Sequence, residues 1–105
     1  MPIINRISDY QSDIVAWRRD LHAHPELMYE LPRTSAFVAD KLKAFGCDEV
    51  ATGIGRTGVV GVIRGRKAAN GSGPKAVALR ADMDALPVTE ITGAPYASTV
   101  EGQMH

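Results

Sequence analysis

Two carboxylates, Asp82 and Asp84, follow directly after an apolar stretch at residues 76–81. In an extended backbone, residues two apart point to the same side, with Cα atoms about 6.5–7 Å apart. In open α/β sheets, ligands bind beyond the carboxyl ends of the strands, which is where both side chains would lie. Two oxygen ligands on one face suit a divalent cation, or one of them can orient a metal-bound imidazole. The spacing alone favours a pair that solvates a loop or caps the next element, so both interpretations stay open.

The three histidines give a weaker signal. His22 and His24 straddle the end of a predicted helix, where residues two apart do not face each other. We therefore expect two exposed polar side chains at a helix terminus rather than a joint metal site. His105 is the last residue of the sequence, and we expect any partner of its ring to lie outside this chain.

Two further features are interpreted structurally. Residues 53–58 read Gly-Ile-Gly-Arg-Thr-Gly, but they precede a strand rather than open a helix. They therefore predict a turn between strands instead of a nucleotide site. Cys47 is the one cysteine, so no internal disulfide is available, and we expect a small buried residue rather than a nucleophile.

The elements that would position these residues begin with a helix. Ser8 and Gln11 form a capping-box pattern, which predicts a helix that starts near Asp9. Pro25 requires this helix to end at or before His24. Its apolar stripe consists of Tyr10, Ile14, Trp17 and Leu21.

A second helix and a series of strands follow. Pro32 suits the first turn of that helix, and Gly46 suits the position just beyond its end. The predicted strands are residues 49–52, 59–63 and 76–81, with a loop at residues 64–75 between the last two. The third strand is apolar apart from Arg80, and we expect it to be buried on both faces. The order of helix, helix and three strands indicates an α/β layer fold.

The composition excludes several classes of partner. The chain has 105 residues with 12 basic and 12 acidic side chains, so its formal net charge is zero. Zero net charge gives no electrostatic reason to expect nucleic acid or an anionic membrane as a partner. No stretch approaches the ~20 apolar residues of a membrane span, and the first ten residues do not resemble a signal peptide. We therefore expect a cytoplasmic protein.

Several stretches, taken in order, resemble the amidohydrolases of the M20 peptidase family, which include hippurate, N-acyl-amino-acid and indoleacetyl-amino-acid hydrolases. Residues 17–27 are similar to the family signature RRxLHxxPEL, residues 57–61 match TGVVG, and residues 80–87 match RADMDALP. Residues 93–98 look like G-x-P-Y-x-S, and residues 102–105 look like the start of GxMHACGHD. This ordered series is far more specific than any one motif.

The resemblance implies an α/β fold, namely the amino-terminal part of an M20-type zinc-peptidase catalytic domain, with two helices followed by sheet strands. In the full-length family this domain has three α/β/α layers. Residues 1–105 would be an incomplete part of one such domain, and the family's dimerisation domain would be absent. The family uses divalent metals, usually zinc, manganese, nickel or cobalt, to activate a water that attacks the amide carbonyl of an N-acyl amino acid.

The family match implies that residues 22–27 serve packing and substrate-side architecture, and it also implies roles for three further residues. Asp84 corresponds to the Asp that orients the metal site without ligating the metal. Asp82 falls where related enzymes place a ligand histidine, so its role stays open. His105 matches the His that precedes the ligating Cys, and we expect it to line the site. Because the family's ligands lie beyond residue 105, we expect the chain alone to bind no metal and to be inactive.

Two other functions remain in view. A strand such as residues 76–81 needs neighbours on both faces, so the chain could bind a partner, or itself, by completing a sheet without catalysis. Alternatively, Asp82 and Asp84 could act as the acid/base pair of a small hydrolase, which would need a shaped cleft.

Overall fold

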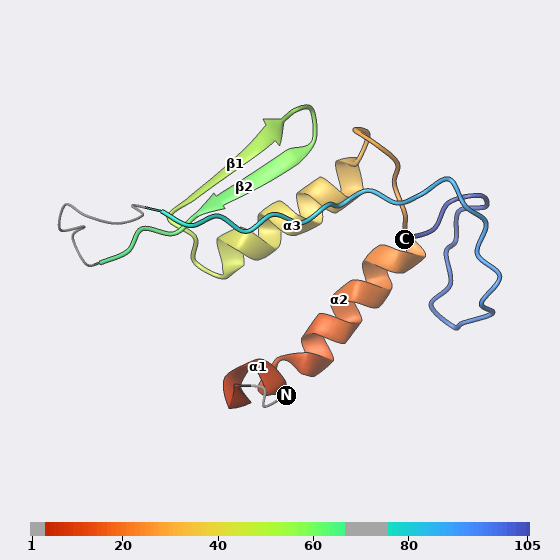
Figure 1. Cartoon of the computed structure of the whole chain (residues 1–105), viewed down its shortest axis with the longest axis horizontal. Coiled ribbons are helices and arrows are strands. Elements are labelled where there is room, and N and C mark those ends of the chain that lie inside the picture. Colours follow the sequence, from red (N-terminus) through yellow and green to blue (C-terminus); the bar gives the residue numbers. More distant parts are fainter. Residues whose placement is uncertain (1–3, 67–75) are drawn as a thin grey trace. The chain divides into compact units, whose positions relative to one another are not determined.

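The computed structural model describes residues 4–66 and 76–105 and divides the chain into two compact units (Figure 1). The first unit comprises residues 1–28 and 84–105, and the second comprises residues 29–83. No helix in the described part of the chain combines the length and the apolar character that crossing a bilayer requires.

The first unit begins with helix α1 (Asn5–Asp9) and helix α2 (Gln11–Ala23). The predicted capping box is wrong, because a short helix already occupies Ser8, and the residue before α2, Tyr10, has helical dihedral angles and no side-chain cap. The predicted end of α2 is confirmed, since the helix stops at Ala23, two residues before Pro25.

The rest of the first unit is irregular chain that folds back on the end of α2. Residue Ala85 forms a parallel bridge with Leu27, and Leu86 forms an antiparallel bridge with Met104. The amide and the hydroxyl of Thr99 both donate to the carbonyl oxygen of Ala23, at 2.9 and 2.7 Å. This last contact satisfies a carbonyl in the final turn of α2, where the helix itself supplies no partner.

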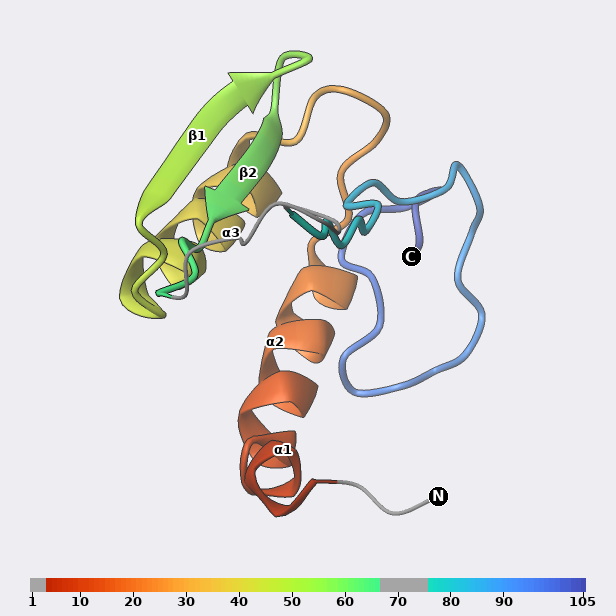
Figure 2. The ribbon, with the colours of Figure 1, turned by 60° about the vertical axis from the view of Figure 1, so that its left-hand side comes forward.

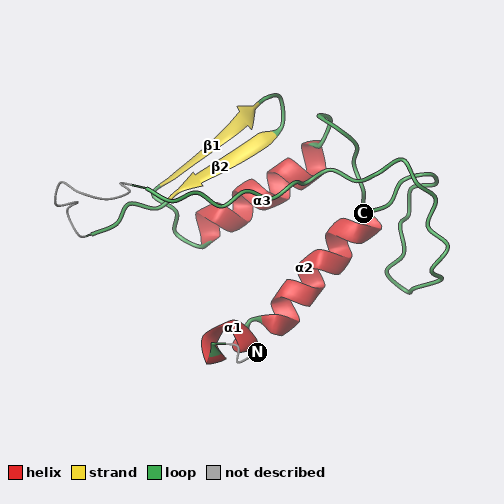
Figure 3. Cartoon of the chain, viewed as in Figure 1, coloured by secondary structure: helices red, strands yellow, loops and turns green. Residues whose placement is uncertain are grey.

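The second unit consists of helix α3 (Pro32–Ala44) and an antiparallel hairpin of β1 (Glu49–Ile54) and β2 (Gly58–Val62) (Figure 3). The hairpin register pairs Glu49 with Val62, and a bulge lies between Ala51 and Ile54. The turn predicted within residues 53–58 is confirmed as the tip of this hairpin.

Helix α3 lies along one face of the hairpin (Figure 2). It begins with Pro32 and ends in a Schellman motif, in which Cys47 N–H donates to the Leu42 carbonyl and Gly46 N–H donates to the Lys43 carbonyl. Gly46 has φ +87°, as predicted for the residue just beyond the helix. The buried apolar side chains of this unit include Leu31 and Ala39, while Cys47 is half-buried.

The strand predicted for residues 76–81 is not formed. Residues 76–80 carry no regular secondary structure, and the side chains of Val77 and Leu79 are 88% and 100% exposed. An extended segment becomes a strand only when a neighbouring strand supplies hydrogen bonds and side-chain cover, and the sheet among the described residues contains only β1 and β2. Residues 67–75 of the predicted loop lie outside the described residues.

Candidate functional site

The carboxylate of Glu90 accepts three hydrogen bonds in the first unit. Its Oε1 accepts from His22 Nε2 at 2.9 Å and from Thr92 Oγ1 at 2.6 Å, and its Oε2 accepts from the amide of Ser98 at 2.5 Å. The Ser98 amide, followed by the Thr92 hydroxyl and His22, lowers the pKa of Glu90 to about 2. Burial opposes this shift, so the hydrogen bonds to the ionised form decide it.

The ring of His22 is buried between Glu90 and Tyr96. Its side chain is 9% exposed, and its ring meets that of Tyr96 edge to face, with centroids 5.9 Å apart and an interplanar angle of 74°. The guanidinium carbon of Arg19, a residue of α2, lies over the same Tyr96 ring, 4.5 Å from its centroid. Because the ionised Glu90 can only accept, Nε2 of His22 must carry the proton in this contact.

The prediction that His22 is exposed is therefore wrong. Residues 90–98, which are distant in sequence, cover its ring through Glu90 and Tyr96. His24 follows the last residue of α2 and does not share the contacts of His22. Its Nδ1 lies 2.8 Å from the backbone oxygen of Asp20. The two histidines do not form a joint site.

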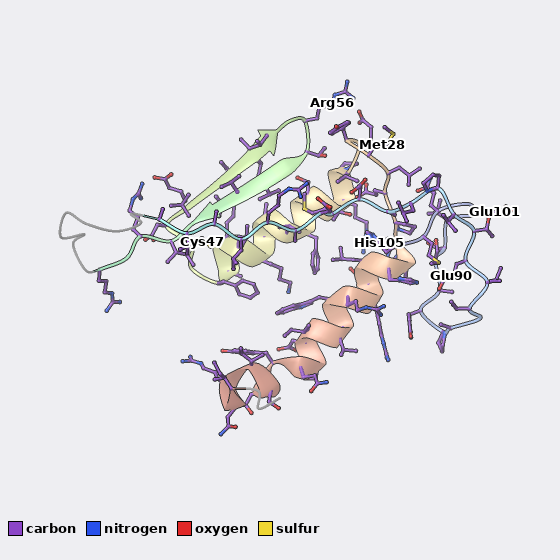
Figure 4. The ribbon with its side chains drawn as sticks, viewed as in Figure 1. Met28, Cys47, Arg56, Glu90, Glu101 and His105 are labelled. Carbon is purple, nitrogen blue, oxygen red and sulfur yellow. The ribbon has the colours of Figure 1, made fainter. Side chains whose placement is uncertain are left out.

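Asp84 and His105 lie next to the paired residues Leu86 and Met104. Two backbone hydrogen bonds, Leu86 N–H to Met104 O at 2.8 Å and Met104 N–H to Leu86 O at 3.0 Å, hold these two segments together. Burial and, next, the neighbouring His22 lower the pKa of His105, while the charge of Asp84 acts in the opposite direction. The charges of His22 and Asp84 therefore both act on the ring of His105, which Figure 4 shows near the end of α2.

Asp82 has a different environment. It belongs to the second unit, whereas Asp84 belongs to the first. Its Oδ1 lies 2.7 Å from Nη2 of Arg80, and both side chains are largely exposed. Water and salt screen such a pair, so it contributes little to stability. The strand end that was expected to present Asp82 and Asp84 together is absent.

The described residues do not form a metal site by themselves. Across residues 4–66 and 76–105, no three side chains of His, Cys, Asp or Glu gather closely enough to hold an ion. A catalytic zinc normally needs three protein ligands, so the site around Glu90 does not fit this metal on its own.

Comparison with known proteins gives these residues a context. No protein-family model matches the chain. It is, however, 45% identical to the hippurate hydrolase of Campylobacter jejuni over 105 residues, which is all of this chain and 26% of that protein. It is 46% identical to thermostable carboxypeptidase 1 of Saccharolobus solfataricus over 102 residues, which cover 96% of this chain and 24% of that protein.

A solved structure agrees with the sequence relatives. The crystal structure of the Bacillus subtilis YxeP protein, described as a dinuclear metal binding peptidase of the M20 family, matches with a TM-score of 0.79 and 37% identity. The chain is a homologue of the M20 peptidases. The match covers 93% of this chain and 26% of that protein, so the chain spans about a quarter of the length of these relatives. The predicted M20-type α/β fold is confirmed.

Sequence reasoning missed Glu90 altogether and misplaced His22. Glu90 lies in a stretch, residues 87–93, that has no clear period, and nothing in its spacing marks it as a buried carboxylate. For His22 the spacing predicted exposure, whereas the resemblance of residues 17–27 to the RRxLHxxPEL signature implied a packing role, and the buried ring agrees with the latter.

Proposed function

We propose that this chain is the amino-terminal part of the catalytic domain of an M20 amidohydrolase, a metal-dependent enzyme that cleaves the amide bond of N-acyl amino acids. The observation that carries the proposal is the 45% identity to a hippurate hydrolase across all 105 residues. The M20 fold, at a TM-score of 0.79, supports it independently. In this proposal residues 1–105 form an incomplete part of one catalytic domain, and the family's dimerisation domain is absent from them.

The substrate class follows from the chemistry that two relatives share. Hippurate is an acylated glycine, and a carboxypeptidase removes a residue from the carboxyl end of a peptide. In both cases the amide that breaks joins an acyl group to an amino acid with a free carboxylate. We infer a small molecule of this kind as the substrate, with hippurate as the reference compound, and a cytoplasmic location.

The metal is proposed for the whole protein rather than for this chain. The name of the Bacillus subtilis neighbour supports a divalent metal, with zinc, manganese, nickel or cobalt as candidates. The described residues gather no ligand set of their own, and Asp84 and His105 are proposed to line the site without completing it. The chain alone is therefore expected to be inactive.

The test measures metal and activity together. We expect the purified 105-residue chain to retain neither zinc nor manganese after dialysis and to release no glycine from hippurate. The complete amidohydrolase proposed here should retain the metal and release glycine. Stoichiometric metal and turnover in the short chain would contradict the proposed division of the site. A complete protein that hydrolyses no N-acyl amino acid would contradict the proposed substrate class.

A second candidate function is partner binding through sheet completion. The exposed side chains of Val77 and Leu79 favour it, because they are apolar, two residues apart and on the same side of an extended segment. We expect the chain to self-associate at high concentration in light scattering, and Leu79→Lys to reduce this association. Ile91→Lys is the matched control, since Ile91 is 93% exposed but lies in the other unit. Equal effects of both variants would contradict a role for this segment.

The third function, an acid/base pair made of Asp82 and Asp84, finds no support in the geometry. Both carboxylates are exposed, and Asp82 is paired with Arg80. General acid catalysis by a carboxylate depends on a sheltered position that holds the proton, which neither side chain has.

A further inference from the structure

Glu90 is buried although it lies in an irregular segment. Its side chain is 4% exposed, and its two oxygens receive three donors that come from separate places in the chain. One donor is His22 in the last turns of α2, and the other two are Thr92 and the amide of Ser98. An ionised carboxylate only accepts hydrogen bonds, so Glu90 joins these three groups as no neutral side chain of its size can.

These contacts fasten the segment to the end of α2. Ser98 closes the loop of residues 90–98 onto Glu90, and the next residue, Thr99, makes both of its hydrogen bonds to Ala23 in α2. Tyr96, inside the loop, packs its ring on His22. The loop is therefore held to the helix at His22 and at Ala23.

The two ends of this segment carry the residues assigned to the site. On the entering side, Ala85 N–H donates to the carbonyl of Glu26 at 2.8 Å, directly after Asp84. On the returning side, Met104 pairs with Leu86, directly before His105. The loop of residues 90–98, which Glu90 holds, lies in the chain between these two ends. Its contacts with α2 therefore bear on the pairing of Met104 with Leu86.

We propose that Glu90 and His22 are positioning residues, which set the place of Asp84 and His105 in the hydrolase site. The inference rests on the proposed function, because it takes Asp84 and His105 to line that site. Glu90 and His22 themselves need not touch the substrate. They act through the paired backbone of Leu86 and Met104.

The first experiment changes Glu90 to Gln in the 105-residue chain. A Gln side chain offers one acceptor oxygen and an NH₂ group, so it cannot accept from His22, Thr92 and the Ser98 amide in the present arrangement. We expect the amides of Leu86 and Met104 to exchange with solvent about tenfold faster or more. The amide of Ser35 in α3 donates to the carbonyl of Leu31, just before that helix. Its exchange rate should be unchanged, since it lies in the other unit.

Glu101→Gln is the matched control, because it makes the same chemical change in the same segment at an exposed residue (Figure 4). It should leave the exchange of Leu86 and Met104 as in the wild type. Unchanged exchange in Glu90→Gln would overturn the inference. Faster exchange at Ser35 to the same extent would also overturn it, because it would show a general effect on stability.

The second experiment measures the kinetics of hippurate hydrolysis by the complete amidohydrolase proposed above. We expect Glu90→Gln and His22→Phe to lower kcat about 10²-fold with little change in KM, since a small misplacement of site residues has that cost. Phe keeps a ring against Tyr96 but removes the donor. His22→Gln restores a donor and should recover part of kcat, which a purely structural packing role would not predict.

The two possible failures are distinguishable. A wild-type protein without hydrolytic activity would overturn the proposed function and the site assignment with it. An active wild type in which Glu90→Gln has the kcat of Glu101→Gln would overturn this inference alone.

Discussion

At the scale of single residues, the hydrogen-bonded carboxylate of Glu90 has a strongly lowered pKa. Its ionised form is stabilised by the Ser98 amide, the Thr92 hydroxyl and His22, which together outweigh the penalty of burial. Protonation would replace an acceptor by a donor and would break at least one of these contacts. The folded state therefore prefers the ionised carboxylate more strongly than the unfolded state does.

This preference predicts a loss of stability in acid. Folding lowers the pKa of Glu90 from an ordinary value of 4.5 to about 2, so its contribution is fully present above 4.5. As the pH falls from 4.5 towards 2, the unfolded state binds the proton first, and the free energy of unfolding decreases. Urea unfolding measured at pH 6 and at pH 3 should show a smaller decrease in the free energy of unfolding for Glu90→Gln than for the wild type.

Glu101→Gln serves again as the control for the acid effect. Glu101 is exposed, so its neutralisation should leave the difference between the two pH values close to that of the wild type. If Glu90→Gln and Glu101→Gln lost stability equally between pH 6 and pH 3, the hydrogen bonds to Glu90 would not be the cause.

At the scale of elements, the hairpin shows how local backbone geometry fixes a structure. Its tip and bulge bring Gly58 so close to Ile54 that a Cβ atom at residue 58 would lie 2.5 Å from the Ile54 carbonyl oxygen. The neighbouring atom belongs to the backbone and cannot rotate away. The sequence marks residues 53–58 as a turn, but this close approach depends on the register of β1 and β2.

We predict that Gly58→Ala destabilises the chain by about 1–3 kcal/mol, because the added methyl group forces the two strands apart. Thermal or urea unfolding measures the change. Gly65→Ala is the comparison, since a Cβ atom at Gly65 meets no atom within 4 Å. A loss of stability no larger than that of Gly65→Ala would mean that the hairpin tip rearranges freely.

At the scale of the whole molecule, the chain corresponds to about a quarter of its M20 relatives. The exposure of residues 76–80 is a feature of the chain that can be tested. Its sequence is that of a buried strand, but a two-stranded hairpin provides neither a third strand position nor a second covering layer among the described residues.

Hydrogen exchange should report this directly. In the 105-residue chain, we expect the amides of residues 76–80 to exchange at nearly unprotected rates, while amides within α3 remain protected. In the complete amidohydrolase proposed above, we expect sheet neighbours to protect the same amides. Slow exchange of residues 76–80 in the short chain, at the rate of global unfolding, would show that the segment already has partners.

The sequence by itself determined the ends of α2 and α3 and the turn of the hairpin, because their signals are local. Pro25 ends α2, Gly46 follows α3, and the glycines of residues 53–58 form the turn through backbone preferences of a few neighbouring residues. Only the tertiary structure decided the burial of His22, whose partner Glu90 lies 68 residues away. It also decided that residues 76–80 stay exposed, since a strand is defined by neighbours that its own sequence does not contain.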